Sequence, residues 1–180
     1  MDIFNEQLVT RKKSAMESAY KYGVFACAAL LIFILTTVGT MFFMGKPYAV
    51  FIFIPYMGAV GVYYLAKKLY GALDIEFEYC LTNGQFDVDK IINRNDRSRM
   101  ITFECKDIDT FAKYDSSVKL DSYSTRIFAA NADSENLYYF VTKANESGKT
   151  IIVIEPNEKM LEGIKRCIPR NIYFDVFGRN

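Results

Sequence analysis

Residues 75–92, with the sequence IEFEYCLTNGQFDVDKII, decide how the second part of this chain folds. Apolar and polar residues alternate on both sides of Asn83-Gly84, which is typical of strands with one buried face. Asn-Gly is the strongest short signal for a two-residue hairpin turn, because both of its positions take a positive φ. With this turn Leu81 lies opposite Phe86, so the apolar side chains share one face. The stretch therefore predicts an antiparallel hairpin that packs against a core.

The opposite face of the predicted hairpin carries four carboxylates, namely Glu76, Glu78, Asp87 and Asp89. The same register sets Glu78 opposite Asp89, and like charges that face each other destabilise a sheet. Solvent, or Arg97 and Arg99 arriving on the next strand, relieves this repulsion. A docked protein and a bound cation are the other interpretations.

Period-two patterns continue beyond the hairpin and predict further strands at 99–105, 108–114, 124–130, 137–143 and 149–154, with a turn over 144–148. An amphipathic helix follows at about 156–168, with Pro156 in its first turn. The tail after Pro169 is apolar enough to pack back or to add an edge strand. We therefore expect residues 74–180 to form a mostly β domain with about seven antiparallel strands in two near-orthogonal sheets, capped by a C-terminal helix. This is the order of a pleckstrin-homology-like (PH-like) domain; a split β-sandwich or a lipocalin-like barrel is the alternative.

Two stretches before this domain, 22–45 and 47–66, contain no Asp, Glu, Lys or Arg, and Lys46 alone separates them. Each is about as long as the roughly 20 apolar residues that cross a hydrocarbon core of about 30 Å. They predict a two-helix transmembrane hairpin over 22–66, joined to the domain by a juxtamembrane linker over 67–73. Gly58 and Gly61 are expected to let the two helices approach closely.

Cations flank the predicted hairpin and are the expected contacts with the membrane surface: Arg11, Lys12, Lys13, Lys67 and Lys68. Positive charge collects on the cytoplasmic side, so both termini and the β-domain are expected in the cytoplasm of a multi-pass inner (cell) membrane protein. A cleaved signal peptide is the rival interpretation of the N-terminus. Its apolar core is normally shorter, and here a second span follows at once.

Residues 1–21 form a basic, amphipathic N-terminal segment. Residues 3–20 are compatible with a short helix that lies in the headgroup layer, where anionic lipid attracts its cations. The alternative is a partly frayed extension of the first span.

Composition excludes several function classes. Histidine is absent, which removes His-dependent catalysis and His-ligated metal sites. No phosphate loop, nucleophile elbow or dinucleotide fingerprint occurs. The four cysteines are far apart, which is typical of small buried side chains in a reducing compartment; a reactive thiol or a chance pair is the alternative. We expect no catalytic residue, no cofactor and no metal, and a membrane-tethered enzyme is the least favoured class.

Charge is unevenly divided along the chain. Residues 1–73 hold seven Lys/Arg and three Asp/Glu, whereas residues 74–180 hold fifteen and eighteen. The domain is mildly acidic without a basic stripe, so nucleic acid is not expected as a partner. Its densest cationic patch contains Arg94, Arg97 and Arg99, which are expected either to contact anionic headgroups or phosphate, or to lie in a solvated loop.

Several motifs resemble an uncharacterised family, a domain of unknown function, of small two-span membrane proteins from Gram-positive, mostly anaerobic bacteria. They lie at 11–13, 75–79, 81–84, 87–93 and 155–161. More loosely, the soluble part resembles bacterial membrane-anchored PH-like domains. The resemblance covers nearly the whole chain; it implies the architecture and supplies no catalytic or binding residue.

The function expected from these features is non-catalytic: a membrane-anchored module that presents a cytoplasmic protein- or lipid-interaction surface. The expected contacts are Arg94, Arg97 and Arg99, followed by the acidic hairpin face. Membrane lipid and a protein partner, or a second copy of the chain, are the expected partners. The alternative is an accessory or homo-oligomeric subunit of a membrane transport assembly, in which the hairpin matters more than the domain.

Overall fold

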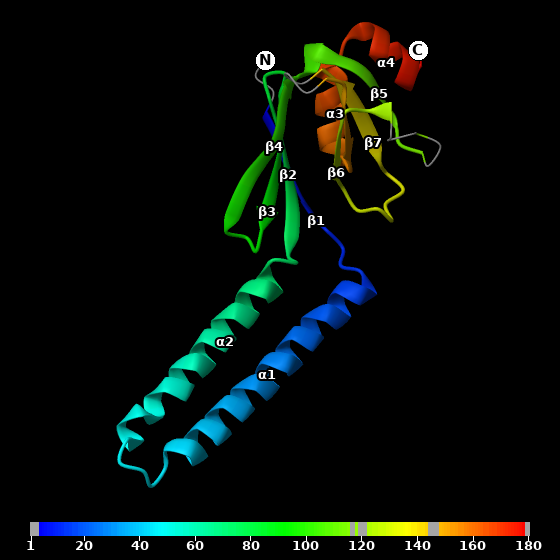
Figure 1. Ribbon diagram of the computed structural model, residues 1–180. Coiled ribbons are helices and arrows are strands. Elements are labelled where there is room, and N and C mark those ends of the chain that lie inside the picture. Colours follow the sequence, from blue (N-terminus) through cyan, green and yellow to red (C-terminus); the bar gives the residue numbers. More distant parts are fainter. Residues whose placement is uncertain (1–3, 116–117, 119–121, 144–147, 179–180) are drawn as a thin grey trace. The chain divides into compact units, whose positions relative to one another are not determined.

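The computed structural model describes residues 4–115, 118, 122–143 and 148–178. These residues form two compact units. The first is a helical hairpin over Lys13–Asp74, and the second is a domain made of the described residues of Met1–Lys12 and Ile75–Asn180 (Figure 1). Residues 144–147 of the turn predicted at 144–148 lie outside the described part of the chain.

The hairpin consists of two long apolar helices that run side by side in opposite directions (Figure 1). They are α1 (Ala15–Phe43) and α2 (Phe53–Gly71), with a short 3-10 helix, η1 (Ala49–Ile52), leading into α2. Both segments are long and apolar enough to cross a membrane. They overlap the predicted spans, 22–45 and 47–66, but α1 begins earlier and α2 ends later than predicted.

Small residues allow close packing within the hairpin. A side chain at Gly39 would collide with Pro55, and a Cβ at Gly58 would come within 2.8 Å of Leu35. Gly58 thus permits close approach, as predicted. A Cβ built at Gly61 would have no atom of the other helix within 4 Å. The prediction that Gly61 also allows close approach was therefore wrong.

The first sheet of the domain, sheet A, is antiparallel throughout. In spatial order its strands are β1 (Phe4–Thr10), β2 (Ile75–Thr82), β3 (Gln85–Ile92) and β4 (Asp96–Glu104). The β2–β3 hairpin has the predicted register, with Leu81 opposite Phe86. Its turn has φ values of 49° at Asn83 and 92° at Gly84, as a type I′ turn requires.

Strand β1 corrects the prediction for the N-terminal segment. Residues 4–10, expected within a helix over 3–20, form the edge strand of sheet A instead. The reason is tertiary: inward-facing Asn5 donates to the Lys159 carbonyl at 3.1 Å, and Gln7 donates to the Glu155 carbonyl at 2.8 Å. A helix would forfeit these bonds and the ladder with β2. Helical structure begins only at Ala15, as α1.

The second sheet, sheet B, has the spatial order β5-β7-β8-β6. Its strands are β5 (Ile108–Lys113), β6 (Thr125–Ala129), β7 (Tyr138–Thr142) and β8 (Thr150–Ile154). A short 3-10 helix, η2 (Cys105–Asp107), leads from β4 into β5. The pairing of β6 with β8 is parallel, not antiparallel as predicted. The described residues thus hold eight strands, one more than the sequence predicts, because β1 was missed.

Two helices close the domain. Helix α3 (Glu158–Cys167) is capped at its N-terminus by Asn157, whose side chain accepts a hydrogen bond from the Met160 amide at 2.8 Å. Its buried face adds Met160 and Ile164 to the core. The tail forms α4 (Arg170–Phe177), which packs back on β5 as a helix rather than as an edge strand. The predicted class, a helical hairpin with a mostly β domain of two sheets and a C-terminal helix, is confirmed.

A cluster of aromatic rings forms the centre of the domain core. Phe140 is fully buried, and its ring centroid lies 5.2 Å from that of Phe86, 5.3 Å from Phe103 and 4.8 Å from Phe111. Phe86 and Phe103 come from sheet A, whereas Phe111 and Phe140 come from sheet B. These rings hold the two sheets together.

The cluster yields a stability prediction. Phe140→Ala removes contacts to three rings and leaves a cavity, so we expect the free energy of unfolding to fall by about 3–5 kcal/mol. The matched control, Phe128→Ala on β6, truncates a side chain that is already 38% exposed and should cost no more than about 1 kcal/mol. Denaturant titration of the full chain in detergent measures both. Equal losses would show that Phe140 is not central to the core.

Candidate functional site

The outer face of sheet A gathers the charged residues singled out in the sequence. Glu76 and Glu78 on β2, and Asp87 and Asp89 on β3, share this face, and Glu78 lies directly opposite Asp89. Three of them, Glu76, Glu78 and Asp89, are at least nine-tenths buried. Long neighbouring side chains, rather than solvent alone, therefore neutralise this face.

Arginines of β4 supply that neutralisation. A bulge follows Val88, so that Arg99 becomes the partner of Asp89. The Nε atoms of Arg97 and Arg99 each lie 2.9 Å from an oxygen of Asp89. One carboxylate, only 7% exposed, thus binds two guanidinium groups that are about half exposed.

The other carboxylates of the face are paired too. Arg97 forms an ion pair with Glu78, and Arg99 lies 3.6 Å from Asp87. Asp87 also accepts a hydrogen bond of 2.7 Å from Thr102. We name this surface the acid–arginine face: Glu6, Glu76, Glu78, Asp87, Asp89, Arg94, Arg97 and Arg99.

Arg94 is the most loosely held member of the acid–arginine face. Its Nε lies 3.7 Å from Glu76 and its side chain is 84% exposed. It occupies the turn between β3 and β4 with a φ of 57°, next to Asn93 at 53°. The three arginines were predicted to share one patch, and in the structure this patch and the acidic residues form one surface.

Glu6 belongs to the face and was missed in the sequence, because it lies on β1. Burial of the Glu78 carboxyl raises its pKa, and the neighbouring Glu6 carboxyl raises this pKa further. The opposite holds for Asp89, whose pKa is lowered first by its hydrogen bond to Arg99. Two of the inward side chains of β1, Asn5 and Gln7, are polar, so the apolar–polar alternation that marks a strand is absent and Glu6 could not be placed from the sequence.

The chemistry available to the face is recognition. Its guanidinium groups are already engaged by carboxylates, and five carboxylates outnumber three arginines, so the face is acidic overall. Among the described residues, no group of three or more Cys, Asp or Glu is arranged to hold a metal ion. The arrangement suits a basic partner better than an anion.

Exposed apolar side chains border the face. Phe4 and Leu8 on β1 are 61% and 55% exposed and point to the same side of sheet A as Glu6. Among the described residues outside the hairpin, Phe128 and Phe174 are the other large apolar side chains with comparable exposure. Of these four exposed side chains, Phe4 and Leu8 are the two on sheet A.

The predicted membrane-surface cations lie near the ends of the hairpin. Lys67 and Lys68 are in the final turns of α2, and the Lys13 ammonium forms an ion pair with Asp74. The backbone amides of Arg11 and Lys12, in contrast, bind Ile75 and Asn131 within the domain. Contact of these side chains with lipid stays a prediction.

Asp74 is a second residue that sequence analysis missed. It binds Lys13 and also the nearly buried Lys21, whose Nζ lies 2.8 Å from its carboxylate and 4.1 Å from the centre of the Tyr70 ring. The hydrogen bonds from Lys13 and Lys21 lower the pKa of Asp74. This cluster joins the start of α1 to the segment that follows α2.

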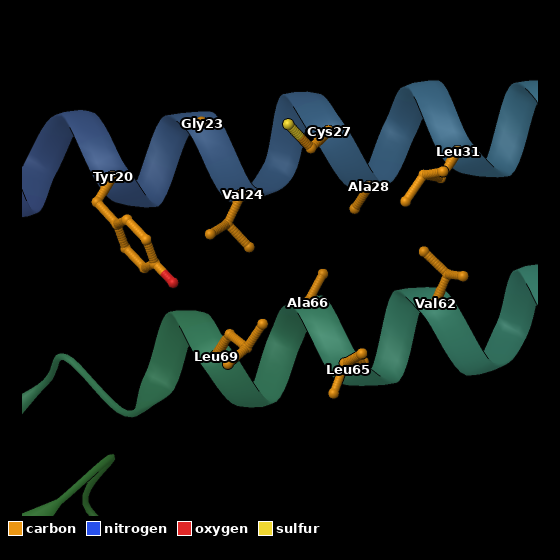
Figure 2. A pocket seen from close by; sticks show the side chains of 10 residues that line it. All are labelled: Tyr20, Gly23, Val24, Cys27, Ala28, Leu31, Val62, Leu65, Ala66 and Leu69. Carbon is orange, nitrogen blue, oxygen red and sulfur yellow. The ribbon is translucent and has the colours of Figure 1, made fainter.

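A groove of about 350 Å³ lies between α1 and α2 (Figure 2). Figure 2 shows Val24 and Ala28 of α1 pointing toward Leu69 and Ala66 of α2. The lining is almost entirely apolar, with the Tyr20 hydroxyl at one end.

The ion pairs of Asp89 yield a pH-dependent prediction. Asp89→Asn leaves two arginines without their shared carboxylate, so we expect a loss of about 2 kcal/mol in unfolding free energy at pH 7. Because the folded-state pKa of Asp89 lies below its ordinary value of 3.8, this stabilisation is complete above that pH and disappears as the pH falls further.

Thermal unfolding of the wild type and the variant at pH 7 and pH 3 tests this. The difference in melting temperature between wild type and variant should be smaller at pH 3 than at pH 7. An exposed control, Asp133→Asn, should have the melting temperature of the wild type at both pH values. A gap that is equally wide at both values would contradict the role given to Asp89.

Comparison with known proteins supports the fold. Residues 1–174 match the model of a family described as Bacterial PH-like domain (DUF6106). No curated protein and no solved structure is detectably similar to the chain. The match spans the hairpin as well as both sheets, which agrees with the resemblance noted in the sequence. The chain therefore belongs to this family of bacterial PH-like domains.

Proposed function

We propose that the protein is a non-catalytic, membrane-anchored interaction module whose acid–arginine face, with Phe4 and Leu8, docks a cytoplasmic or membrane-associated protein. The observation that carries this proposal is the exposure of Phe4 and Leu8 beside an acidic field on one sheet. A partner with apolar side chains flanked by Lys or Arg is the complement of such a surface.

Charge favours protein over lipid as the occupant of this face. Arg97 and Arg99, the side chains most suited to a phosphate, already bind Glu78 and Asp89. An anionic headgroup would have to displace those carboxylates and would meet an excess of negative charge. A basic protein surface would meet the excess of carboxylates without displacing the arginines, and the exposed Glu6 is the carboxylate most open to it.

A non-catalytic role agrees with the family and with the composition. PH-like domains are typically interaction modules, and this chain has no histidine for general acid–base chemistry. The two apolar helices supply the anchor in this proposal, and the cations around them orient it with both termini in the cytoplasm.

Removal of the apolar pair tests the docking proposal. Phe4→Ser with Leu8→Ser should cut recovery of a cross-linked protein partner from cells at least about tenfold, since buried aromatic and aliphatic anchors dominate interface energies. The matched control, Phe174→Ser, alters a similarly exposed ring on α4 and should leave recovery unchanged.

The alternatives give different results in that experiment. If the Phe4→Ser/Leu8→Ser variant recovers as much cross-linked partner as the Phe174→Ser control, docking at this face is contradicted. If the recovered protein is a multi-span membrane protein that the double variant still binds, the hairpin is the contact and the transport-assembly interpretation holds. If the domain floats with anionic vesicles and the Phe4→Ser/Leu8→Ser change does not alter this flotation, the domain binds lipid through another surface.

The orientation is tested separately. Fusion of green fluorescent protein to the C-terminus should fluoresce, and fusion of alkaline phosphatase should be inactive, because the positive-inside rule places that end in the cytoplasm. A fusion placed after Lys46, between the two helices, should give the reverse pattern. An active phosphatase at the C-terminus would overturn the orientation.

A further inference from the structure

Two cysteines that lie far apart in the sequence meet at one point of the domain. The Sγ atoms of Cys105 and Cys167 are 2.8 Å apart, although 62 positions separate the residues. Both are free thiols in the structure. Cys105 is the first residue of η2, and Cys167 is the last residue of α3.

The surrounding structure holds both sulfur atoms in place. The Cys105 amide donates to the Gly84 carbonyl at 2.7 Å, which fixes η2 against the turn of the β2–β3 hairpin. The Cys167 thiol lies 3.3 Å from the carbonyls of Gly163 and Ile164, one turn back along α3. A disulfide requires sulfur atoms about 2.05 Å apart, so they need to approach by less than about 1 Å.

The two cysteines differ in exposure. Cys105 is 2% exposed, whereas Cys167 is half-buried. Both line a pocket of about 490 Å³ whose walls include the β2–β3 turn, Glu104 and Lys106. A small polar molecule that enters this pocket therefore reaches the Cys167 sulfur before that of Cys105.

The hydrogen bond between the two sulfurs polarises the pair. It lowers the pKa of Cys167, and the same bond, together with burial, raises the pKa of Cys105. Cys167 is consequently the first of the two to form the thiolate, which is the nucleophilic form.

We propose that Cys105 and Cys167 form a redox-active dithiol that low-molecular-weight disulfides oxidise to an intramolecular disulfide. The geometry that supports this is the close approach of two sulfur atoms whose residues both line one pocket. In a reducing cytoplasm such bonds are transient and act in redox sensing. The bond would tie the C-terminal end of α3 to η2, the link between the two sheets.

The reaction balances as a two-step thiol–disulfide exchange. The Cys167 thiolate attacks one sulfur of a disulfide RSSR, forming a mixed disulfide and releasing RS⁻. The Cys105 sulfur then attacks the Cys167 sulfur, expels the second R group as RSH with the Cys105 proton, and closes the protein disulfide. The proton that Cys167 lost protonates the first RS⁻. Two protein thiols are oxidised by two electrons, and RSSR is reduced to two RSH.

Oxidation of the purified full chain in detergent tests the proposal, with oxidised glutathione as the probe. After free thiols are alkylated, peptide mapping without reductant should give one linked pair, Cys105 with Cys167, whose two peptides together are two hydrogens lighter than in the reduced form. Added reductant should reverse it. Cys80, a single half-buried cysteine on the other face of sheet A, is the internal control.

Two variants separate the roles of the thiols. Cys105→Ser should trap the mixed disulfide, so that the protein carries one glutathionyl group on Cys167. Cys167→Ser should leave Cys105 unmodified, because Cys105 is buried. The folded wild type is sufficient to overturn the proposal: if Cys105 and Cys167 both remain alkylatable at a glutathione concentration that modifies Cys80, or if the linkage found involves Cys27 or Cys80, the pair is not a redox site.

Discussion

Strict alternation of side chains along the β2–β3 hairpin is the constraint on which the rest of the domain depends. One set of side chains, including Tyr79 and Phe86, is fully buried in the core. The other set contributes four carboxylates to the acid–arginine face: Glu76, Glu78, Asp87 and Asp89. The Tyr79 hydroxyl donates to the Ala129 carbonyl and accepts from the Glu155 amide at 3.2 Å, so it connects sheet A to the ends of β6 and β8. A register slip of one residue would put the carboxylates in the core and the aromatic rings in solvent.

Sequence alone was sufficient where the signals are local. The Asn83-Gly84 turn determines the hairpin register, and the register determines which carboxylates share a face. Two charge-free stretches separated by Lys46 were likewise enough to predict an apolar hairpin. The arginines were predicted as possible neutralisers, although Arg97 and Arg99 have the same parity along β4 as Ile101 and the buried Phe103. The bulge at Met100, which the β3–β4 pairing skips, turns both arginines to the outer face. Which arginine binds which carboxylate was therefore beyond prediction.

The predictions failed where distant residues decide the outcome. Residues 4–10 form a strand because they pair with β2 and because Asn5 and Gln7 bind backbone groups near α3, about 150 positions away. Short amphipathic runs of this kind fit a helix as well as a strand. Because β1 was not predicted, Glu6, Phe4 and Leu8 were not placed on this face. These three residues make a set of ion-paired side chains into a candidate docking surface. The parallel pairing of β6 with β8 and the meeting of Cys105 with Cys167 have the same origin in long-range topology.

The parts of the chain have separate roles in the function that we propose. The apolar hairpin would anchor the protein, the core aligns the two sheets, and sheet A would present an acidic surface bordered by Phe4 and Leu8 to a partner. Site-specific photo-cross-linking in living cells tests this most directly, with a photoreactive phenylalanine analogue in place of Phe4 or, in a parallel strain, of Phe174. The account predicts a discrete protein adduct from position 4 and none from position 174. No adduct from position 4, or the same adducts from both positions, would contradict it.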